Sequence, residues 1–307
     1  MNYAAFCALI VLSLALPSAS PERATRAGDV SEDQRGSKSD NRTRDVYVTV
    51  VDAKGAPIQG LTAADFAVRE DGTAREVLKA GPATEPLQIA LLVDDSQAAT
   101  SMIQPLRESL TAFIDKLQGK AEIALITFGE RPTTAVEYTP SAEQLKKAVG
   151  RIFAKPAAGP YFLEALVEAS RGLERRKATR PVIVAITIEG IEFSNQHYQQ
   201  VLDAIARSGA TLHVLSVGSP SDSMSDEMRN RNMVIAEGTE RTGGRREQVL
   251  ADMALPDEMR QLADELLNQY VVTYGRPETL IPPERIEVTT KRTGATVRAR
   301  TRLGEGR

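Results

Sequence analysis

The residues of this chain best suited to chemistry stand where an apolar segment ends in two aspartates and a serine. Leu87–Val93 carries almost no polar side chain, and Asp94, Asp95 and Ser96 follow directly. Such a run is typical of a strand buried on both faces of a parallel sheet, and open α/β sheets bind ligands at the carboxyl edge. Asp94 and Ser96 offer hard oxygen ligands two residues apart, which suits Mg²⁺ or Ca²⁺. The alternative is a helix N-terminus capped by Asp or Ser.

The middle of the chain alternates apolar strands with amphipathic helices. The predicted strands are Leu87–Val93, 121–128, Pro181–Ile188, Thr211–Val217 and 269–274. Between them, apolar residues recur at helical spacing over 103–117, 162–173 and 259–266, as expected of helices that cover a sheet on one face. This alternation predicts an α/β fold, a doubly wound and mostly parallel sheet over residues 85–279.

The segments that flank this domain have the pattern of β-strands. Residues 45–52 alternate and are rich in valine, and Asp71-Gly72 separates two strand-like stretches as a hairpin turn would. Thr293-Gly294 separates two more stretches near the C-terminus. Because a single hairpin is marginally stable in water, we expect residues 45–84 and 280–307 to form one small β-sandwich.

The first residues predict export. Residues 3–20 carry no charged side chain and end in small residues, so 1–20 are interpreted as a secretory signal peptide. The alternative is an uncleaved N-terminal anchor, although the apolar stretch is shorter than the ~20 residues that a membrane span needs. Residues 21–44 are polar and predict a disordered linker. The single cysteine, Cys7, falls in the signal, and a mature chain without disulfides fits a secreted or periplasmic bacterial protein.

Composition and motifs argue against two classes of protein. A net charge of −3 over 307 residues gives no global basic field, so no nucleic-acid partner is expected. The sequence contains no nucleophile elbow, phosphate-binding loop or histidine-rich metal spacing. His213 lies in a predicted strand and is interpreted as a core residue, and His197 as a helix start. We therefore expect no enzyme and no small-molecule cofactor, and keep a secreted hydrolase built on the carboxylates as an alternative.

Several short motifs, in their order and spacing, resemble the von Willebrand factor type A family over residues 87–274. The loop after the first strand is similar to the family's Asp-x-Ser-x-Ser, residues 121–129 to its second strand, and 180–190 to the strand that normally ends in Asp-Gly. The flanks, with Asp65-Phe66 and Asp71-Gly72, resemble a bacterial exported, von Willebrand-related subgroup. The resemblance implies a protein-binding module in which a divalent ion, held by three loops, meets a carboxylate of the partner.

The resemblance also implies metal ligands, and three positions depart from it. Asp94 and Ser96 match the first loop, but Ala98 stands where its second serine is expected. Pro160 stands where the second loop has threonine, and Glu189 replaces the aspartate of the third. A hard cation that loses oxygen ligands takes up water instead and is held more weakly. We therefore expect either no cofactor or weakly bound Mg²⁺ or Ca²⁺ at Asp94, Ser96 and Glu189.

Together these observations predict an exported, non-enzymatic module for adhesion or protein binding, whose degenerate metal site is weakened or lost. The unknown protein partner would lie in the cell envelope or outside the cell and would contact loops 94–101, 159–162 and 189–195. Candidate contact residues are Asp95, Ser101, Tyr161 and Phe193; for the two aromatic residues, the alternative is packing beneath the loops. The competing hypothesis is a metal-dependent adhesion module that retains Mg²⁺.

Overall fold

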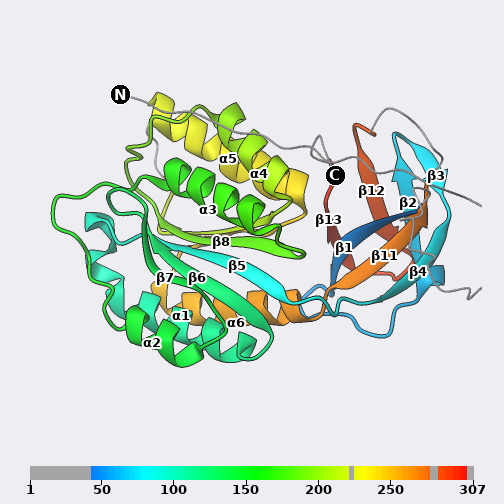
Figure 1. Cartoon of the computed structure of the whole chain (residues 1–307), viewed down its shortest axis with the longest axis horizontal. Coiled ribbons are helices and arrows are strands. Elements are labelled where there is room, and N and C mark those ends of the chain that lie inside the picture. Colours follow the sequence, from blue (N-terminus) through cyan, green and yellow to red (C-terminus); the bar gives the residue numbers. More distant parts are fainter. Residues whose placement is uncertain (1–42, 221–224, 277–282, 303–307) are drawn as a thin grey trace, which may run out of the picture. The chain divides into compact units, whose positions relative to one another are not determined.

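The structure is a computed structural model that describes residues 43–220, 225–276 and 283–302 (Figure 1). The predicted signal peptide, residues 1–20, and almost all of the predicted linker, 21–44, lie outside the described residues. Strand β1 (Thr43–Val51) begins two residues before the predicted strand, so the linker was predicted too long by Thr43 and Arg44. In the described part of the chain, no helix combines the length and the apolar character that crossing a membrane requires.

A mostly parallel sheet lies at the centre of the α/β domain, as predicted. Its order is β10-β9-β8-β5-β6-β7. Neighbouring strands run parallel except for β7, which is antiparallel to β6. The strands are β5 (Leu87–Val93), β6 (Ala121–Thr127), β7 (Thr133–Thr139), β8 (Pro181–Ile188), β9 (Thr211–Val217) and β10 (Arg246–Val249). All the parallel strands end at one carboxyl edge, where their loops meet.

Helices cover both faces of this sheet (Figure 1). One face carries α1 (Ile103–Leu117), α2 (Ala142–Val149) and α6 (Leu255–Leu267), and the other α3 (Phe162–Arg176), α4 (Tyr198–Ser208) and α5 (Asp226–Thr242). Strand β5 feeds both cores: Ile89 and Leu91 belong to the first, and Ala90 and Leu92 to the second. Because alternate side chains of a strand point to opposite faces, a strand covered on both sides must be apolar throughout.

Strands from both ends of the chain form the predicted small β-sandwich. One sheet has the order β13-β1-β11-β4 and the other β12-β2-β3, and both contribute to one apolar core that includes Val48, Phe66 and Val272. The bounds are β2 (Phe66–Glu70), β3 (Thr73–Arg75), β4 (Val77–Pro82), β11 (Tyr270–Gly275), β12 (Ile286–Thr290) and β13 (Thr296–Ala299). The hairpin at Asp71-Gly72 is confirmed, and both residues have the positive φ, 48° and 79°, that a type I′ turn requires.

Two predictions about the strands were wrong. Residues 269–274 were assigned to the parallel sheet, but β11 lies antiparallel between β1 and β4 in the sandwich. Its residues alternate between buried and partly exposed, as in a strand with only one face in a core. The two strands around Thr293-Gly294 do not pair along their length either, because β12 pairs with β2 and β13 with β1; a backbone hydrogen bond from Ile286 to Thr301 at 2.8 Å joins only their far ends. The α/β domain therefore ends with α6, before the predicted boundary at residue 279.

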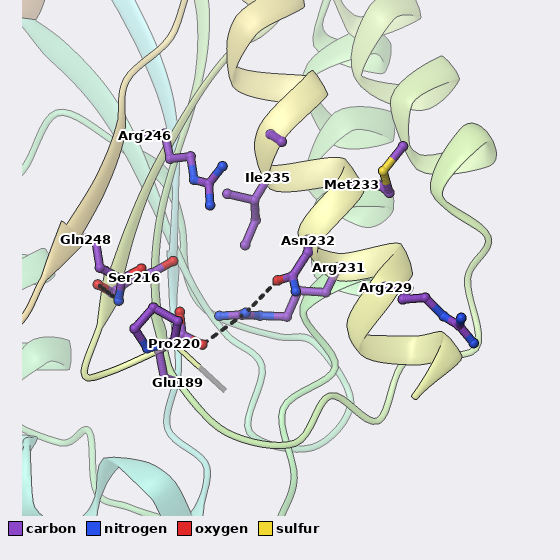
Figure 2. A pocket seen from close by; sticks show the side chains of 11 residues that line it. Glu189, Ser216, Pro220, Arg229, Arg231, Asn232, Met233, Ile235, Arg246 and Gln248 are labelled. Carbon is purple, nitrogen blue, oxygen red and sulfur yellow. Dashed lines mark hydrogen bonds and ion pairs between the residues drawn. The ribbon is translucent and has the colours of Figure 1, made fainter. Parts of the chain in front are cut away.

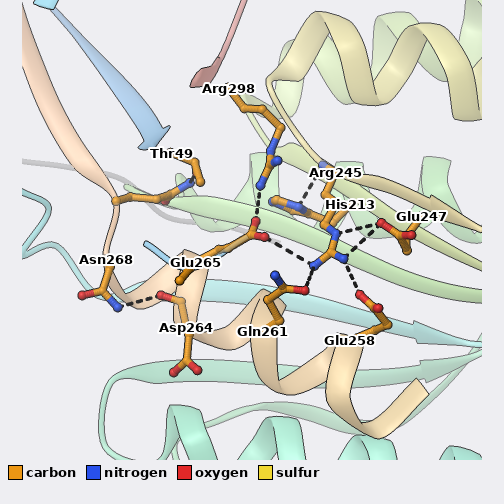
Figure 3. Close-up of polar contacts among 12 residues, drawn as sticks. Thr49, His213, Arg245, Glu247, Glu258, Gln261, Asp264, Glu265, Asn268 and Arg298 are labelled. Atoms are coloured by element: carbon orange, nitrogen blue, oxygen red, sulfur yellow. Dashed lines mark hydrogen bonds and ion pairs between the residues drawn. The ribbon is translucent and has the colours of Figure 1, made fainter. Parts of the chain in front are cut away.

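A cluster of buried charges, which we call the Glu265 cluster, joins the sandwich to the α/β domain (Figure 3). Glu265 of α6 accepts hydrogen bonds from Arg298 of β13 and, at 3.3 Å, from Arg245. The backbone N–H of Arg245 donates to Nδ1 of His213 at 3.1 Å. Burial, and then the charges of Arg298 and Arg245, lower the pKa of His213 to about 3, so the ring stays neutral and can accept this bond. The interpretation of His213 as a core residue is confirmed.

Candidate functional site

Asp94 joins the ends of two neighbouring strands at the carboxyl edge. One carboxylate oxygen accepts a hydrogen bond from the backbone N–H of Ser96 at 2.9 Å, and the other from that of Ile188, the last residue of β8, at 3.1 Å. The side chain is fully buried, and this burial raises the pKa of Asp94. Asp94 therefore holds the first loop against the start of the third.

Ser96 offers the one feature of the first loop that suits a bound ion. Its side chain is fully buried, and its hydroxyl oxygen makes no hydrogen bond of good geometry with any described residue, although the carboxylate of Asp94 is close enough to influence it. It also does not cap the short helix Gln97–Ser101 that begins after it, so capping does not explain the residue. A buried hydroxyl without a partner is costly, and a water or a cation beside Asp94 would satisfy it.

Glu189 is engaged elsewhere (Figure 2). Its carboxylate lies 3.3 Å from the guanidinium of Arg231, which extends from α5, is 3% exposed and also donates to Thr187. Gly218, after β9, is close to the Glu189 side chain. Among the described residues, no group of three or more His, Cys, Asp and Glu side chains is arranged to hold a metal ion. Of the three predicted ligands, Asp94 and Ser96 belong to one loop, whereas the carboxylate of Glu189 is paired with Arg231, and two side-chain ligands alone do not fit a firmly held cation.

The third loop also caps helix α3. One oxygen of Glu192 accepts from the backbone N–H groups of Phe162 and Ser194, both at 3.1 Å, and the hydroxyl of Ser194 accepts from Leu163 at 3.0 Å. The other oxygen of Glu192 lies 4.0 Å from Arg231. Burial is the main cause that raises the pKa of Glu192 to about 7. Helix N-termini favour such acceptors, which satisfy their free N–H groups.

Sequence reasoning missed Glu192 and Arg231. The signal for Arg231 was its place on the buried face of α5, in line with Met228 and Ile235, where a charged side chain requires a buried partner. The signal for Glu192 was weaker, since it is a single acidic residue between the apolar Ile191 and Phe193.

Asp95 and Ser101, both predicted partner contacts, have different surroundings. Asp95 is 4% exposed, and its carboxylate accepts from the N–H of Gly129 at 2.6 Å and pairs with Lys155 at 3.2 Å. A Cβ on Gly129 would lie 2.4 Å from the backbone of Asp95, so only glycine allows the two loops to approach this closely. Asp95 thus fixes the loops, whereas Ser101 ends the short helix Gln97–Ser101 and is exposed.

Tyr161 and Phe193 lie next to one another at the same edge. Their ring centroids are 6.4 Å apart, and the N–H of Phe193 donates to the carbonyl of Pro160 at 3.0 Å. A Cβ on Gly159 would meet the Phe193 ring at 2.0 Å, so the ring rests directly on this glycine. Phe193 nevertheless remains 48% exposed. One side of the ring packs on the second loop and the other faces solvent, and contact with a partner stays a prediction.

Comparisons with known proteins agree with this fold. Residues 89–189 match the sequence profile of the von Willebrand factor type A domain, and no curated protein sequence matches the chain. Among solved structures, a von Willebrand factor type A protein from Catenulispora acidiphila superimposes with a TM-score of 0.51 and 12% identity, over 86% of this chain and 75% of that one.

Two further solved structures have lower TM-scores. The conserved hypothetical protein BatB from Bacteroides thetaiotaomicron gives 0.46 at 16% identity, over 59% of this chain and 98% of that one. Proximal thread matrix protein 1 from the mussel byssus, with a zinc-occupied MIDAS motif, gives 0.49 at 14% identity, over 69% of this chain and 50% of that one. Residues 89–189 are thus recognised as similar to the von Willebrand factor type A domain, and the sheet order and the helices on both faces give this part of the chain the corresponding α/β fold.

Proposed function

We propose that this protein is an exported, non-enzymatic module that binds another protein through the carboxyl edge of its central sheet, with a divalent-ion site that is weakened or lost. Its export rests on the charge-free segment 3–20 of the sequence. The observation that carries the proposal is the exposure of large apolar side chains at this edge.

Among the described residues, seven large apolar side chains are exposed, and five of them lie in loops at the carboxyl edge. Ile191 and Phe193 follow β8, Leu250 and Met253 follow β10, and Phe153 belongs to the 150–161 loop, which bonds to Asp95. Exposed apolar side chains that gather in one region mark interaction sites, and their burial against a partner supplies binding energy. We call Ile191, Phe193, Leu250 and Met253 the apolar edge.

The same geometry disfavours a hydrolase built on the carboxylates. Asp94 and Asp95 are buried and accept backbone N–H groups, and Glu189 is paired with Arg231. A catalytic base must reach the proton that it removes, whereas these three carboxylates are occupied in holding the loops together. They support a rigid scaffold for binding.

The ion-dependent alternative would use Asp94, Ser96 and Glu189. For Glu189 to coordinate an ion beside Asp94, its carboxylate would have to leave Arg231, and a buried guanidinium would lose a partner. Ala98 and Pro160 supply no side-chain oxygen. The arrangement therefore supports partner contacts made directly by the loops.

We expect the double substitution Ile191→Ser and Phe193→Ser to abolish partner binding. Each side chain buries apolar area in the complex, and the loss of two such contacts weakens binding about a hundredfold or more. The measurement is affinity capture from envelope and secreted fractions of the source organism, with quantification of the protein that the parent retains.

Leu78 on β4 provides the matched control, because it is 48% exposed, as Phe193 is, but lies in the β-sandwich. Leu78→Ser should retain the same protein as the parent, and all variants should melt within about 2 °C of it. If Leu78→Ser lost as much partner binding as the double variant, or if the double variant lost no binding, the partner would not use the apolar edge.

We expect divalent ions to stabilise the protein little. An ion present at a hundred times its Kd adds about 2.7 kcal/mol, which raises the melting temperature of a domain this large by about 5 °C or more. With only Asp94 and Ser96 in place, Mg²⁺, Mn²⁺ or Ca²⁺ at millimolar concentration should shift the melting temperature by less than about 2 °C. Differential scanning calorimetry with each ion, and with EDTA, measures this shift.

Two variants test the explanation of this result. The triple variant Ala98→Ser, Pro160→Thr and Glu189→Asp restores the family pattern and should gain ion-dependent stability. Ser96→Ala serves as the control, since it removes the hydroxyl and leaves the Asp94 hydrogen bonds in place. A large melting shift in the parent that Ser96→Ala removes would favour the metal-dependent adhesion module instead.

A further inference from the structure

A cavity of about 430 Å³ opens beside the apolar edge (Figure 2). Its lining comes from α5, from β9 and from β10, the edge strand of the central sheet. Met233 and Ile235 of α5 and Pro220 give it an apolar wall, and Arg246 of β10 extends from the opposite side towards Ile235. This volume lies in the range of small-ligand sites, which combine apolar walls with a few polar groups.

Among the described residues, one of the three guanidinium groups that line the cavity has no carboxylate partner. Arg231 pairs with Glu189 at 3.3 Å and lies 4.0 Å from Glu192, and Arg229 pairs with Asp226. Arg246 has no side-chain hydrogen bond or ion pair with any described residue, and it is exposed. Within the part of the chain that the structure describes, the cavity thus combines apolar side chains with one arginine, Arg246, that is paired with no carboxylate.

We propose that this cavity binds a singly charged carboxylate joined to a short apolar group, with the carboxylate on Arg246 and the apolar group against Met233 and Ile235. A guanidinium can donate two parallel hydrogen bonds to a carboxylate. Asn232 can add a donor, because its amide oxygen already accepts from Arg231 at 3.3 Å and its NH₂ group remains. The apolar group would pack on the four apolar residues of the lining, Pro220, Met233, Ile235 and Ala236.

The carboxylate of Glu189 selects against doubly charged ligands. This carboxylate lines the cavity and is paired with Arg231. A phosphate with two negative charges would be repelled by Glu189, and only the guanidinium of Arg246 would be left to offset its charge. A monocarboxylate matches the one positive charge. This inference is independent of the proposed function, because the apolar edge and the lining of the cavity share no residue.

The test uses N-acetyl-leucine, and its neutral analogue N-acetyl-leucinamide, on full-length protein with ¹³C-methyl methionine. Met233 lines the cavity and reports binding, while Met253, 85% exposed in the loop after β10, is the internal control. We expect the Met233 methyl resonance, assigned with Met233→Leu, to shift saturably with a Kd below about 10 mM. Met253 should not shift, and the amide should bind about tenfold more weakly or worse, because it lacks the charge.

Arg246→Gln should weaken binding of N-acetyl-leucine about tenfold or more, because it removes a charge-assisted hydrogen bond. Arg229→Gln is the matched control, since Arg229 lines the same cavity but is already paired with Asp226, and it should bind like the parent. Equal binding by the parent and Arg246→Gln, or no saturable shift of Met233, would overturn the proposal. Arg246 would then serve only to discourage edge-to-edge pairing of β10.

A peptide that ends in leucine with a free carboxylate distinguishes the source of the ligand. If it shifts Met233 as N-acetyl-leucine does, the cavity accepts a chain terminus. If only N-acetyl-leucine binds, the ligand is a small free acid. The double variant Ile191→Ser and Phe193→Ser should leave this binding unchanged, so failure of the proposed function and failure of this proposal give different results.

Discussion

Replacing Glu265 with alanine should lower the free energy of unfolding by about 3 kcal/mol or more, because Arg298 loses the one carboxylate that it pairs with among the described residues, whereas Arg245 keeps Glu247 and Glu258. Glu265 is 2% exposed. Arg298 of β13 donates to one of its oxygens and Arg245 donates to the other. Burial raises the pKa of Glu265, and the two arginines oppose that effect, so the carboxylate and its partners depend on one another. Urea unfolding of the variant and the parent measures the difference.

Glu247 supplies the control for this prediction, because it pairs with the same Arg245 at 3.0 Å from a more exposed position. Glu247→Ala should lower the free energy of unfolding by less than about 1 kcal/mol, as is usual for exposed pairs. A loss of under about 1 kcal/mol for Glu265→Ala as well would show that Arg298 and Arg245 find other partners. The Glu265 cluster would then not be needed to join the sandwich to α6.

The sequence predicted the α/β domain well because burial on both faces leaves a strong pattern. Leu87–Val93 and Pro181–Ile188 each contain a single polar residue, and both lie in the middle of the central sheet. The pattern says whether a strand is buried but not which strand it pairs with. Residues 269–274 were therefore placed in the wrong sheet, although their alternation already favoured a strand with one exposed face.

Turn residues in the sequence also do not reveal which strands pair with one another. Asp71-Gly72 does close a hairpin, because β2 and β3 pair directly across it. Thr293-Gly294 carries a similar signal, yet β12 and β13 lie in different sheets, where they pair with β2 and β1. Local sequence specifies the turn, whereas partners that are hundreds of residues away decide the strand pairing.

The candidate site was predictable in position but not in detail. The carboxyl edge, Asp94 and Ser96 follow from the end of a buried strand. The direction of Glu189 depends on Arg231, 42 residues further along the chain, and no local pattern near Glu189 encodes it. The burial of Asp95 depends in the same way on Gly129 and Lys155. Partners set by the tertiary fold decide what such side chains do.

Stability near neutral pH should depend on Glu192. Burial raises its pKa from the ordinary 4.5 to about 7 in the folded protein, so between these values the folded state holds a proton that the unfolded state has released. The stabilisation is complete below about pH 4.5 and is lost as the pH rises through about 7. Since each unit of difference in pKa is worth about 1.4 kcal/mol, Glu192 should lower the free energy of unfolding by about 3 kcal/mol across this interval.

Glu192→Gln isolates this effect, because the amide keeps an oxygen to accept from Phe162 and Ser194 but carries no charge. Urea unfolding at intervals between about pH 5 and pH 8 should show the parent losing about 3 kcal/mol relative to the variant. Asp94 and Glu265, whose pKa values burial also raises, and His213, whose pKa it lowers, are present in both proteins and cancel in the difference. A difference that stays constant over this range would mean that Glu192 is already ionised at pH 5 when folded, held so by Arg231 at 4.0 Å. A difference that grows with pH would mean that Glu192 loses its proton near neutrality. The proton would then be lost from the residue that caps α3 and lies between the exposed Ile191 and Phe193.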